Sequence, residues 1–301
     1  MAAAACGDCA TCPLSGTVKA HDAHVVVASA ARLEEVADSK IEAAEDERLA
    51  HARALAAAMA DVGVKGVKVT ASDERTPPLK PLARRLYAWA GAMLVVGLVA
   101  WGISNKTSSL VVGLVPSALL LRAAIRRADL ENLESADSAC EVRIFAKFER
   151  SARFRVRYSQ MLAFAKALAA IDFKSSGPIQ LGAPFEAEPS GDDPAHFIYV
   201  CTHKARDARC GRAGPPLVEA LGEAAKRRRK DGGPRVAVHG TSHVGGHKYA
   251  GCAIAYPSGD WFGHVAKPNS EELLSTVIAA KRWPSKWRGN AFTGEGVETE
   301  F

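Results

Sequence analysis

Residues 197–215, FIYVCTHKARDARCGRAGP, begin with a short apolar run that ends directly at Cys201 and continue through a charged stretch to Cys210. An apolar run of this length, bounded by polar residues, is typical of a β-strand buried inside a sheet. A helix is predicted at 215–230 and a second strand at 235–238. The order strand, helix, strand favours an α/β fold in which Cys201 lies at the end of a strand.

Residues 240–257, GTSHVGGHKYAGCAIAYP, place His243 and His247 shortly after the second of these strands. Three residues separate the two histidines, and eight separate the two cysteines. Gly245 and Gly246 allow the backbone to turn tightly between the histidines, including at positive φ. This favours a loop over the helix of a zinc protease, which also has a glutamate after its first histidine. Adjacent strand ends can therefore bring both ligand pairs to one edge of the sheet.

Two cysteines and two histidines suit more than one kind of metal centre. Tetrahedral Zn²⁺ accepts this set of ligands directly. A [2Fe-2S] cluster is usually held by thiolates, and histidines on one iron raise its potential because neutral imidazole donates less electron density. A solvent-facing imidazole also exchanges its second proton, which makes the potential depend on pH. Rieske proteins carry two Cys-x-His pairs, whereas this region separates its two candidate cysteines from its two candidate histidines, and the spacing alone leaves zinc and iron–sulfur open.

The same region carries a family resemblance in four motifs: CTHKARDARCG at 201–211, SHVGGHKYAG at 242–251, YPSGDWFGHV at 256–265 and WRGN at 287–290. They resemble the sucrase/ferredoxin-like family, also described as thioredoxin-like ferredoxins, and SGTVKAHDAHVVVASA at 15–30 resembles the family's opening strand. The resemblance implies a thioredoxin-like ferredoxin sheet with flanking helices over residues 15–70 and 196–290. It also implies a [2Fe-2S] cluster bound by Cys201, Cys210, His243 and His247. No paired-carboxylate signature supports hydrolysis of sugars.

Other residues of this region are expected to support the site without binding metal. Asp207, between the two cysteines, is predicted to hold its loop through hydrogen bonds to the backbone or to arginine. Cys252 is predicted to be a small buried residue, and His239 and His264 are expected to be ordinary sheet residues.

The seven cysteines are an odd number and are not spaced like a secreted disulfide framework. Cys6, Cys9 and Cys12 lie in an N-terminal tail, residues 1–16, that lacks the basic region and long apolar core of a secretory signal. Three close thiols are a weak metal signal and fit a mobile or redox-reactive tail better. The protein is therefore predicted to be intracellular, in a reducing compartment.

A pair of apolar runs differs from the α/β pattern around it. Residues 86–103 contain no charged side chain, and a second run extends over 108–125 if the arginine within it reaches the interface. A membrane-spanning helix needs about 20 apolar residues. Arginines at both outer ends favour a transmembrane hairpin with both ends on the positive side of the bilayer. A buried helical pair in a soluble domain and a partner-binding hairpin are the alternatives.

Periodicity and helix breakers predict the remaining elements, with no internal repeat. Strands are predicted at 24–28 and 67–70, a hairpin at 253–256 and 261–265, and helices at 30–62, 128–170 and 270–281. The basic, aromatic stretch 143–158 is predicted to lie on a membrane surface or to pack as an amphipathic helix. The predicted divisions are the tail at 1–16, an α/β part at 17–74, an inserted helical region at 75–175, a linker at 176–195, the ferredoxin domain at 196–290 and a C-terminal tail at 291–301.

These patterns predict a membrane-attached redox protein that carries one electron, optionally coupled to a proton, rather than a stand-alone enzyme. The net charge of +6 is concentrated partly on either side of the apolar pair, which favours a bilayer over nucleic acid. Its expected partners are redox proteins, the membrane through residues 86–125, and a larger membrane complex. The alternatives are a zinc-stabilised structural subunit of such a complex and a thiol-redox protein. A mitochondrion, a chloroplast and the cytosolic face of another membrane all remain open as locations.

Overall fold

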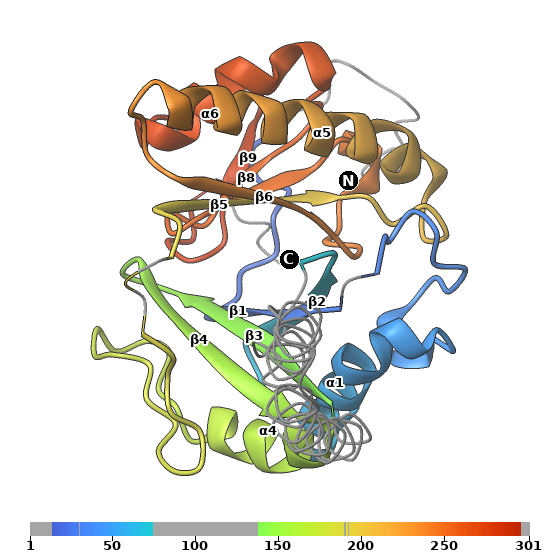
Figure 1. Ribbon diagram of the computed structural model, residues 1–301, viewed down its shortest axis with the longest axis vertical. Helices are drawn as coiled ribbons and strands as arrows, with labels where there is room; N and C mark the ends of the chain where they lie inside the picture. Colours follow the sequence, from blue (N-terminus) through green and yellow to red (C-terminus); the bar gives the residue numbers. More distant parts are fainter. Residues whose placement is uncertain (1–13, 30, 75–137, 190, 192, 296–301) are drawn as a thin grey trace, which may run out of the picture. The chain divides into compact units, whose positions relative to one another are not determined.

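A sheet of nine strands organises the described part of the chain, in the order β4-β3-β1-β2-β6-β5-β7-β8-β9 (Figure 1). The computed structural model describes residues 14–29, 31–74, 138–189, 191 and 193–295. Apart from Ala139 at the start of β3, the elements described here belong to one compact unit. The strands are β1 Ala23–Ala28, β2 Val67–Ser72, β3 Ala139–Ala146, β4 Arg150–Arg157, β5 His196–Cys201, β6 Val236–Thr241, β7 Ala253–Tyr256, β8 Asp260–Phe262 and β9 Trp287–Asn290.

Four α-helices of the described residues cover the sheet. They are α1 Ala50–Val62, α4 Met161–Ala169, α5 Ala208–Lys230 and α6 Ser270–Ile278. Short 3-10 turns lie at Ile41–Ala43, Glu47–Leu49, Tyr158–Gln160, His247–Tyr249 and Lys267–Asn269. Within the described residues, every helix is too short or too polar to cross a bilayer. The predicted hairpin at 86–103 and 108–125 lies outside those residues and stays a prediction.

The two halves of the sheet repeat one order of elements, so the expectation of no internal repeat is wrong. The N-terminal half runs β1–α1–β2 and then β3–β4–α4, and the C-terminal half runs β5–α5–β6 and then β7–β8–α6. In each half the first two strands are parallel, and the third pairs antiparallel with the first. The halves meet where β2 pairs antiparallel with β6. The repeat lies in topology, which side-chain comparison along the sequence does not detect.

Alternation along β5 decides where Cys201 points. Ile198 and Val200 pack into the core beneath α5 and α6, in the same cluster as Leu217 and Leu221 of α5. The intervening Phe197, Tyr199 and Cys201 face the opposite side, where they join a second cluster that also holds Phe145 of β3. Because successive side chains of a strand alternate between faces, Cys201 lies on the face shared with the N-terminal half. Stacking of Phe145 on Tyr256, with ring centroids 3.9 Å apart, closes this face.

The predicted helix over 30–62 is much shorter in the structure and begins only at Ala50. The preceding segment is held by aspartates instead of helical hydrogen bonds. The carboxylate of Asp38 accepts the backbone N–H groups of Glu45 and Asp46, and Asp46 accepts that of Arg48. Aspartate side chains compete in this way with the helical backbone pattern. The helix ends as predicted at Gly63, whose φ of 74° is the left-handed conformation that glycine favours.

The predicted helix over 128–170 is wrong for residues 139–157, which form the hairpin of β3 and β4. The basic stretch is therefore neither a membrane-surface helix nor a packing helix. Arg143 is buried, and its guanidinium lies 2.6 Å from the Glu141 carboxylate and 3.0 Å from that of Asp193. An amphipathic helix over this stretch would need its charged side chains on an exposed face. Arg143 is instead buried in the sheet and paired with carboxylates.

Helix α5 begins at Ala208, earlier than the predicted start at Pro215. Proline favours the first turn of a helix, which motivated the prediction, but here Pro215 and Pro216 lie inside α5. The start is set instead by Asp207, whose side chain caps the helix by accepting the N–H of Arg209 at 2.9 Å. Cys210 consequently lies in the first turn of α5. The strands predicted at 24–28, 67–70, 197–200 and 235–238, the hairpin at 253–265 and the helix from 270 are confirmed with small shifts at their ends.

Candidate metal centre

Three of the four predicted ligands lie together at one edge of the sheet. Cys201 is the last residue of β5, Cys210 is in the first turn of α5, and His243 follows β6. Their sulfur and ring-nitrogen atoms all lie within 4.8 Å of one another. Both cysteines are buried, at 1% and 0% exposure. The parallel pairing of β5 with β6 produces this arrangement, because it aligns Cys201 with Thr241 and so brings both strand ends to the same edge.

His247 lies beside this group without joining it. Its ring centroid is 5.5 Å from that of His243, and its side chain is exposed whereas that of His243 is half-buried. The two glycines between the histidines have φ values of 100° and 71°, as expected from the predicted tight turn. The connection between β6 and β7, residues 242–252, is called the ligand loop below.

The two thiols differ in their tendency to ionise. A hydrogen bond from the Cys210 thiol, together with the nearby His243 ring, holds the pKa of Cys201 well below its ordinary value. The same hydrogen bond raises the pKa of Cys210, and burial raises it further. The Cys201 sulfur lies 4.0 Å from Nδ1 of His243. Cys201 is therefore the thiolate of the pair, the form of cysteine that binds metals.

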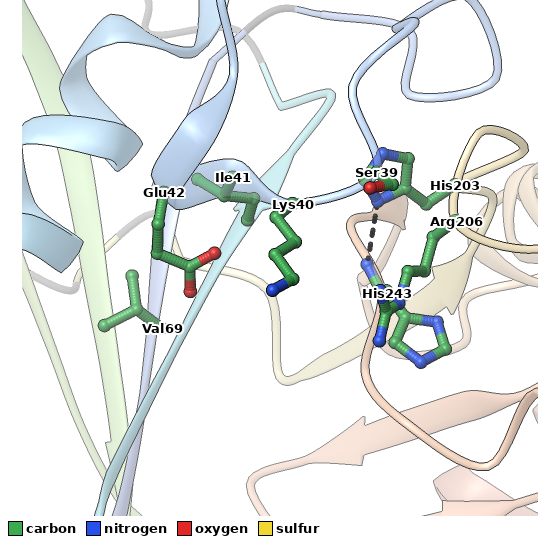
Figure 2. Close-up of a pocket in the computed structure, with 8 residues that line it drawn as sticks. All are labelled: Ser39, Lys40, Ile41, Glu42, Val69, His203, Arg206 and His243. Carbon is green, nitrogen blue, oxygen red and sulfur yellow. Dashed lines mark hydrogen bonds between the residues drawn. The ribbon is translucent and has the colours of Figure 1, made fainter.

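His203 fixes the position of His243, a role that sequence analysis does not assign to it. Its Nε2 lies 2.6 Å from the carbonyl oxygen of Asp38, so this nitrogen donates. Nδ1 is then free to accept the backbone N–H of His243 at 3.4 Å, the contact drawn as a dashed line in Figure 2. Burial lowers the pKa of His203, which keeps the ring neutral and this pattern intact. The contact joins residues far apart in sequence, so local patterns carry no signal for it.

Arg288 and Cys252 hold the ligand loop from the other side. Arg288, in β9, is 1% exposed, and its guanidinium donates to the carbonyl oxygens of Thr17 at 2.7 Å and Gly245 at 3.4 Å. Cys252 is buried as predicted, and its thiol donates to the carbonyl oxygens of Gly246 and Tyr249. These bonds tie the loop to the N-terminal segment and to its own far end.

Two pockets open beside His243. One, of about 410 Å³, is lined by Lys40, Glu42, His203 and Arg206 among others, and Figure 2 shows Arg206 beside the His243 ring. The other, of about 260 Å³, is lined by residues of the ligand loop, of β2 and of β9. His243 is thus the member of the group that small molecules can reach.

Asp207 has the supporting role predicted for it. Besides capping α5, its carboxylate accepts the side-chain Nε–H of Arg209 at 3.0 Å. This hydrogen bond is the main reason that the pKa of Asp207 falls to about 2. The charged cap fixes the first turn of α5 and with it Cys210. The predicted redox or metal role of Cys6, Cys9 and Cys12 falls outside the described residues.

The donor set decides which metals fit. Two sulfurs and one imidazole converge, a second imidazole lies next to the first, and no carboxylate belongs to the group within the described residues. Thiolate and imidazole ligands suit zinc and iron–sulfur clusters, whereas magnesium and calcium prefer oxygen ligands. The site therefore fits either of the two centres that the sequence leaves open.

Comparison with known proteins gives relatives and a family. Two relatives named "Altered inheritance of mitochondria protein 32" are similar, one from Debaryomyces hansenii and one from Eremothecium gossypii. The first is 41% identical over 111 residues, 35% of this chain and 38% of that protein. The second is 32% identical over 130 residues, 38% of this chain and 36% of that protein. The chain thus spans little more than a third of the length of these relatives.

Among solved structures, a thioredoxin-like [2Fe-2S] ferredoxin from Aquifex aeolicus matches at 13% identity and a TM-score of 0.28. This match covers 31% of this chain and 88% of the ferredoxin. A family model described as sucrase/ferredoxin-like matches residues 14–289, which include all four predicted ligands. The resemblance stated from the motifs is confirmed, and the chain belongs to the sucrase/ferredoxin-like family.

Proposed function

We propose that this protein is a one-electron carrier whose [2Fe-2S] cluster is held by Cys201, Cys210, His243 and His247. The observation that carries the proposal is the convergence of two buried cysteine sulfurs and one histidine nitrogen within 4.8 Å. The ferredoxin-like family supports iron–sulfur over zinc, although both fit the donors. The electron donor and acceptor would be other redox proteins.

The residues around the site have distinct parts in this function. Cys201 and Cys210 would supply the thiolates, and the rings of His243 and His247 would supply the nitrogens. When bound, such a cluster takes up and releases one electron. His247 is exposed, so its ring would lie in contact with water at the edge of the site. The buried cysteines keep the sulfur side away from solvent, which leaves the histidine edge as the side for electron exchange.

The C-terminal half also supports the thioredoxin-like assignment. Its strands lie in the order β6-β5-β7-β8, with a parallel β5–α5–β6 unit followed by an antiparallel hairpin and α6. This is the order of elements in a thioredoxin-like core, and it puts Cys201 at a strand end. A Cys-x-x-Cys dithiol is absent from the described residues, which favours a metal centre over thiol exchange.

The metal content, sulfide content and colour of the purified protein test this proposal. Protein purified without oxygen is expected to be reddish-brown and to contain about two iron and two sulfide per chain. Inductively coupled plasma mass spectrometry, a sulfide assay and visible absorption measure these properties. Colourless protein with one zinc and no sulfide would contradict the proposal and support the zinc-stabilised structural subunit.

Replacing His247 or His243 with cysteine is expected to keep a cluster but lower its reduction potential and weaken its pH dependence. Thiolate donates more electron density than imidazole and has no second proton to exchange. The exposed His247 is expected to account for more of the pH dependence than His243. Potentiometric titration between about pH 5 and pH 9 measures both effects. His196→Cys, at the opposite end of β5, is the control, and an unchanged potential in both ligand variants would contradict histidine ligation.

Membrane attachment and a mitochondrial location extend the proposal. The relatives are named for inheritance of mitochondria, and residues 86–125 carry the two apolar runs from which a membrane hairpin is predicted. Carbonate extraction of mitochondrial membranes is expected to leave the protein in the pellet. A variant with residues 86–125 replaced by a glycine–serine linker is expected in the supernatant. Release of the unaltered protein would contradict integral insertion and, with it, membership of a membrane complex through this segment.

A further inference from the structure

The smaller pocket beside His243 is lined by basic residues. Its charged side chains other than the histidine are Lys19, Lys68, Lys248 and Arg288, and its walls include the rings of Tyr249 and Trp261. We call it the cation pocket. No aspartate or glutamate lines it among the residues that the structure describes. Four positive groups around about 260 Å³ produce a strongly positive potential inside a concave site, where low-dielectric walls strengthen it.

Lys68 is the central cation of this pocket. It projects from β2, is only partly exposed, and its ammonium lies 5.5 Å from the centre of the Trp261 ring. Neither Lys68 nor Lys19 forms an ion pair with a carboxylate in the described part of the chain. Burial lowers the pKa of Lys68 to about 8. The charges of Arg288 and Lys19 add to this shift, whereas those of Cys201 and Glu42 oppose it. A bound anion would favour the charged form of Lys68, because an opposite charge nearby stabilises an ammonium group.

Arg288 contributes charge from a fixed position, whereas Lys19 and Lys68 contribute ammonium groups that can donate to a ligand. The Nε and Nη2 groups of Arg288 donate to the hydroxyl and carbonyl oxygens of Thr17, and Nη1 faces Gly245 and Cys252. Its position is therefore fixed by the fold. Lys19 is exposed and Lys68 is deeper, so an anion could be held between an outer and an inner ammonium group.

We propose that the cation pocket binds a small anion of the carboxylate or phosphate class, directly beside His243. Its volume lies below the roughly 300–1,000 Å³ of pockets for drug-sized ligands, which favours a small ligand over a nucleotide. The inference does not depend on which metal the neighbouring site holds. It assigns to this edge of the protein a second ligand whose negative charge would lie next to a metal-binding histidine.

Isothermal titration calorimetry of the full-length protein tests the proposal with inorganic phosphate and with malonate, at ionic strength held constant with sodium chloride. Saturable binding of at least one anion is expected. Binding of phosphate alone, or of malonate alone, would identify whether the pocket selects phosphates or carboxylates. Lys68→Met is expected to weaken binding about tenfold or more, the loss of one charge-assisted hydrogen bond. Lys281→Met, an exposed lysine just after α6, is the control and is expected to leave affinity unchanged.

Two outcomes would overturn the proposal. One is the absence of saturable binding for both anions, and the other is equal affinity in the Lys68 and Lys281 variants. Circular dichroism checks that Lys68→Met folds. If it does not fold, Lys19→Gln tests the outer donor of the same pocket, since an exposed lysine can be replaced without disturbing the core. Calorimetry on metal-free protein separates anion binding from any failure of the proposed cluster.

Discussion

Replacing Cys201 or Cys210 with serine is expected to abolish metal binding, with loss of iron, of sulfide and of visible colour. A serine hydroxyl remains protonated near neutral pH and is a hard oxygen donor, so it replaces a thiolate poorly at a soft metal site. The effect is expected to be close to complete because the group within 4.8 Å has three members among the described residues, with His247 beside it. Metal analysis and absorption spectra of each variant measure the loss.

Cys140→Ser is the matched control for these variants. Cys140 is a free, buried cysteine of β3 that packs in the core of the N-terminal half, in a cluster that contains neither Cys201 nor Cys210. Its replacement also buries a hydroxyl in an apolar core, so it reproduces the cost in stability without touching the site. It is expected to keep full metal content. Full metal content in Cys201→Ser as well would contradict the assignment of the ligands.

Gly214→Ala is expected to damage both the fold and the metal site, although Gly214 binds nothing itself. Gly214 lies in α5, where a Cβ atom would overlap the carbonyl oxygen of Cys201 and lie 3.0 Å from Cα of Thr202. Both are backbone atoms, so they cannot rotate away as a flexible side chain would. Helix α5 and the end of β5 must separate. These two elements carry Cys210 and Cys201, so the distance between the two sulfurs must change as well.

Gly222→Ala, eight positions further along the same helix, is the control. Its Cβ would meet nothing within 4 Å, and alanine in a helix interior is favoured over glycine by about 0.5–1 kcal/mol. Relative to Gly222→Ala, the free energy of unfolding of Gly214→Ala is expected to be lower by about 1–3 kcal/mol, the usual cost of overpacking. Urea denaturation measures this difference, and metal content reports on the site. Equal stability of the two variants would contradict the close packing of α5 against the backbone of Cys201.

Sequence patterns predict the strands and turns that local residue types determine. The strands that end at Ala28, Ser72, Cys201 and Thr241 are predictable because each is a short stretch rich in valine or other strand-forming residues, bounded by polar residues or glycine. The turn between His243 and His247 is predictable because two adjacent glycines adopt positive φ at little cost. The cysteines and histidines are candidate ligands because of their residue types. The sheet then explains how the cysteine pair and the histidine pair, distant in sequence, come together.

The wrong prediction of a helix over β3 and β4 has a physical cause in contacts between segments far apart in sequence. The hairpin of β3 and β4 has many charges, and its helical interpretation treated them as solvated. Arg143 is buried because Glu74 and Asp193, from two distant segments, join Glu141 of its own strand in pairing with it. The roles of His203 and Arg288 depend in the same way on Asp38 and Thr17, which no local pattern connects to the ligand loop.

The repeated order of elements in the two halves has a consequence for how this protein can vary. In the C-terminal half, the connection between the second and third strands is the ligand loop. In the N-terminal half, the corresponding connection runs from the end of β2 to the start of β3 and includes the apolar residues 86–125. Surface connections tolerate changes in length far better than packed strands do. Each half thus has one connection at the same step of its topology, and a change in the length of the segment that would anchor the protein is expected to leave the ligands in register.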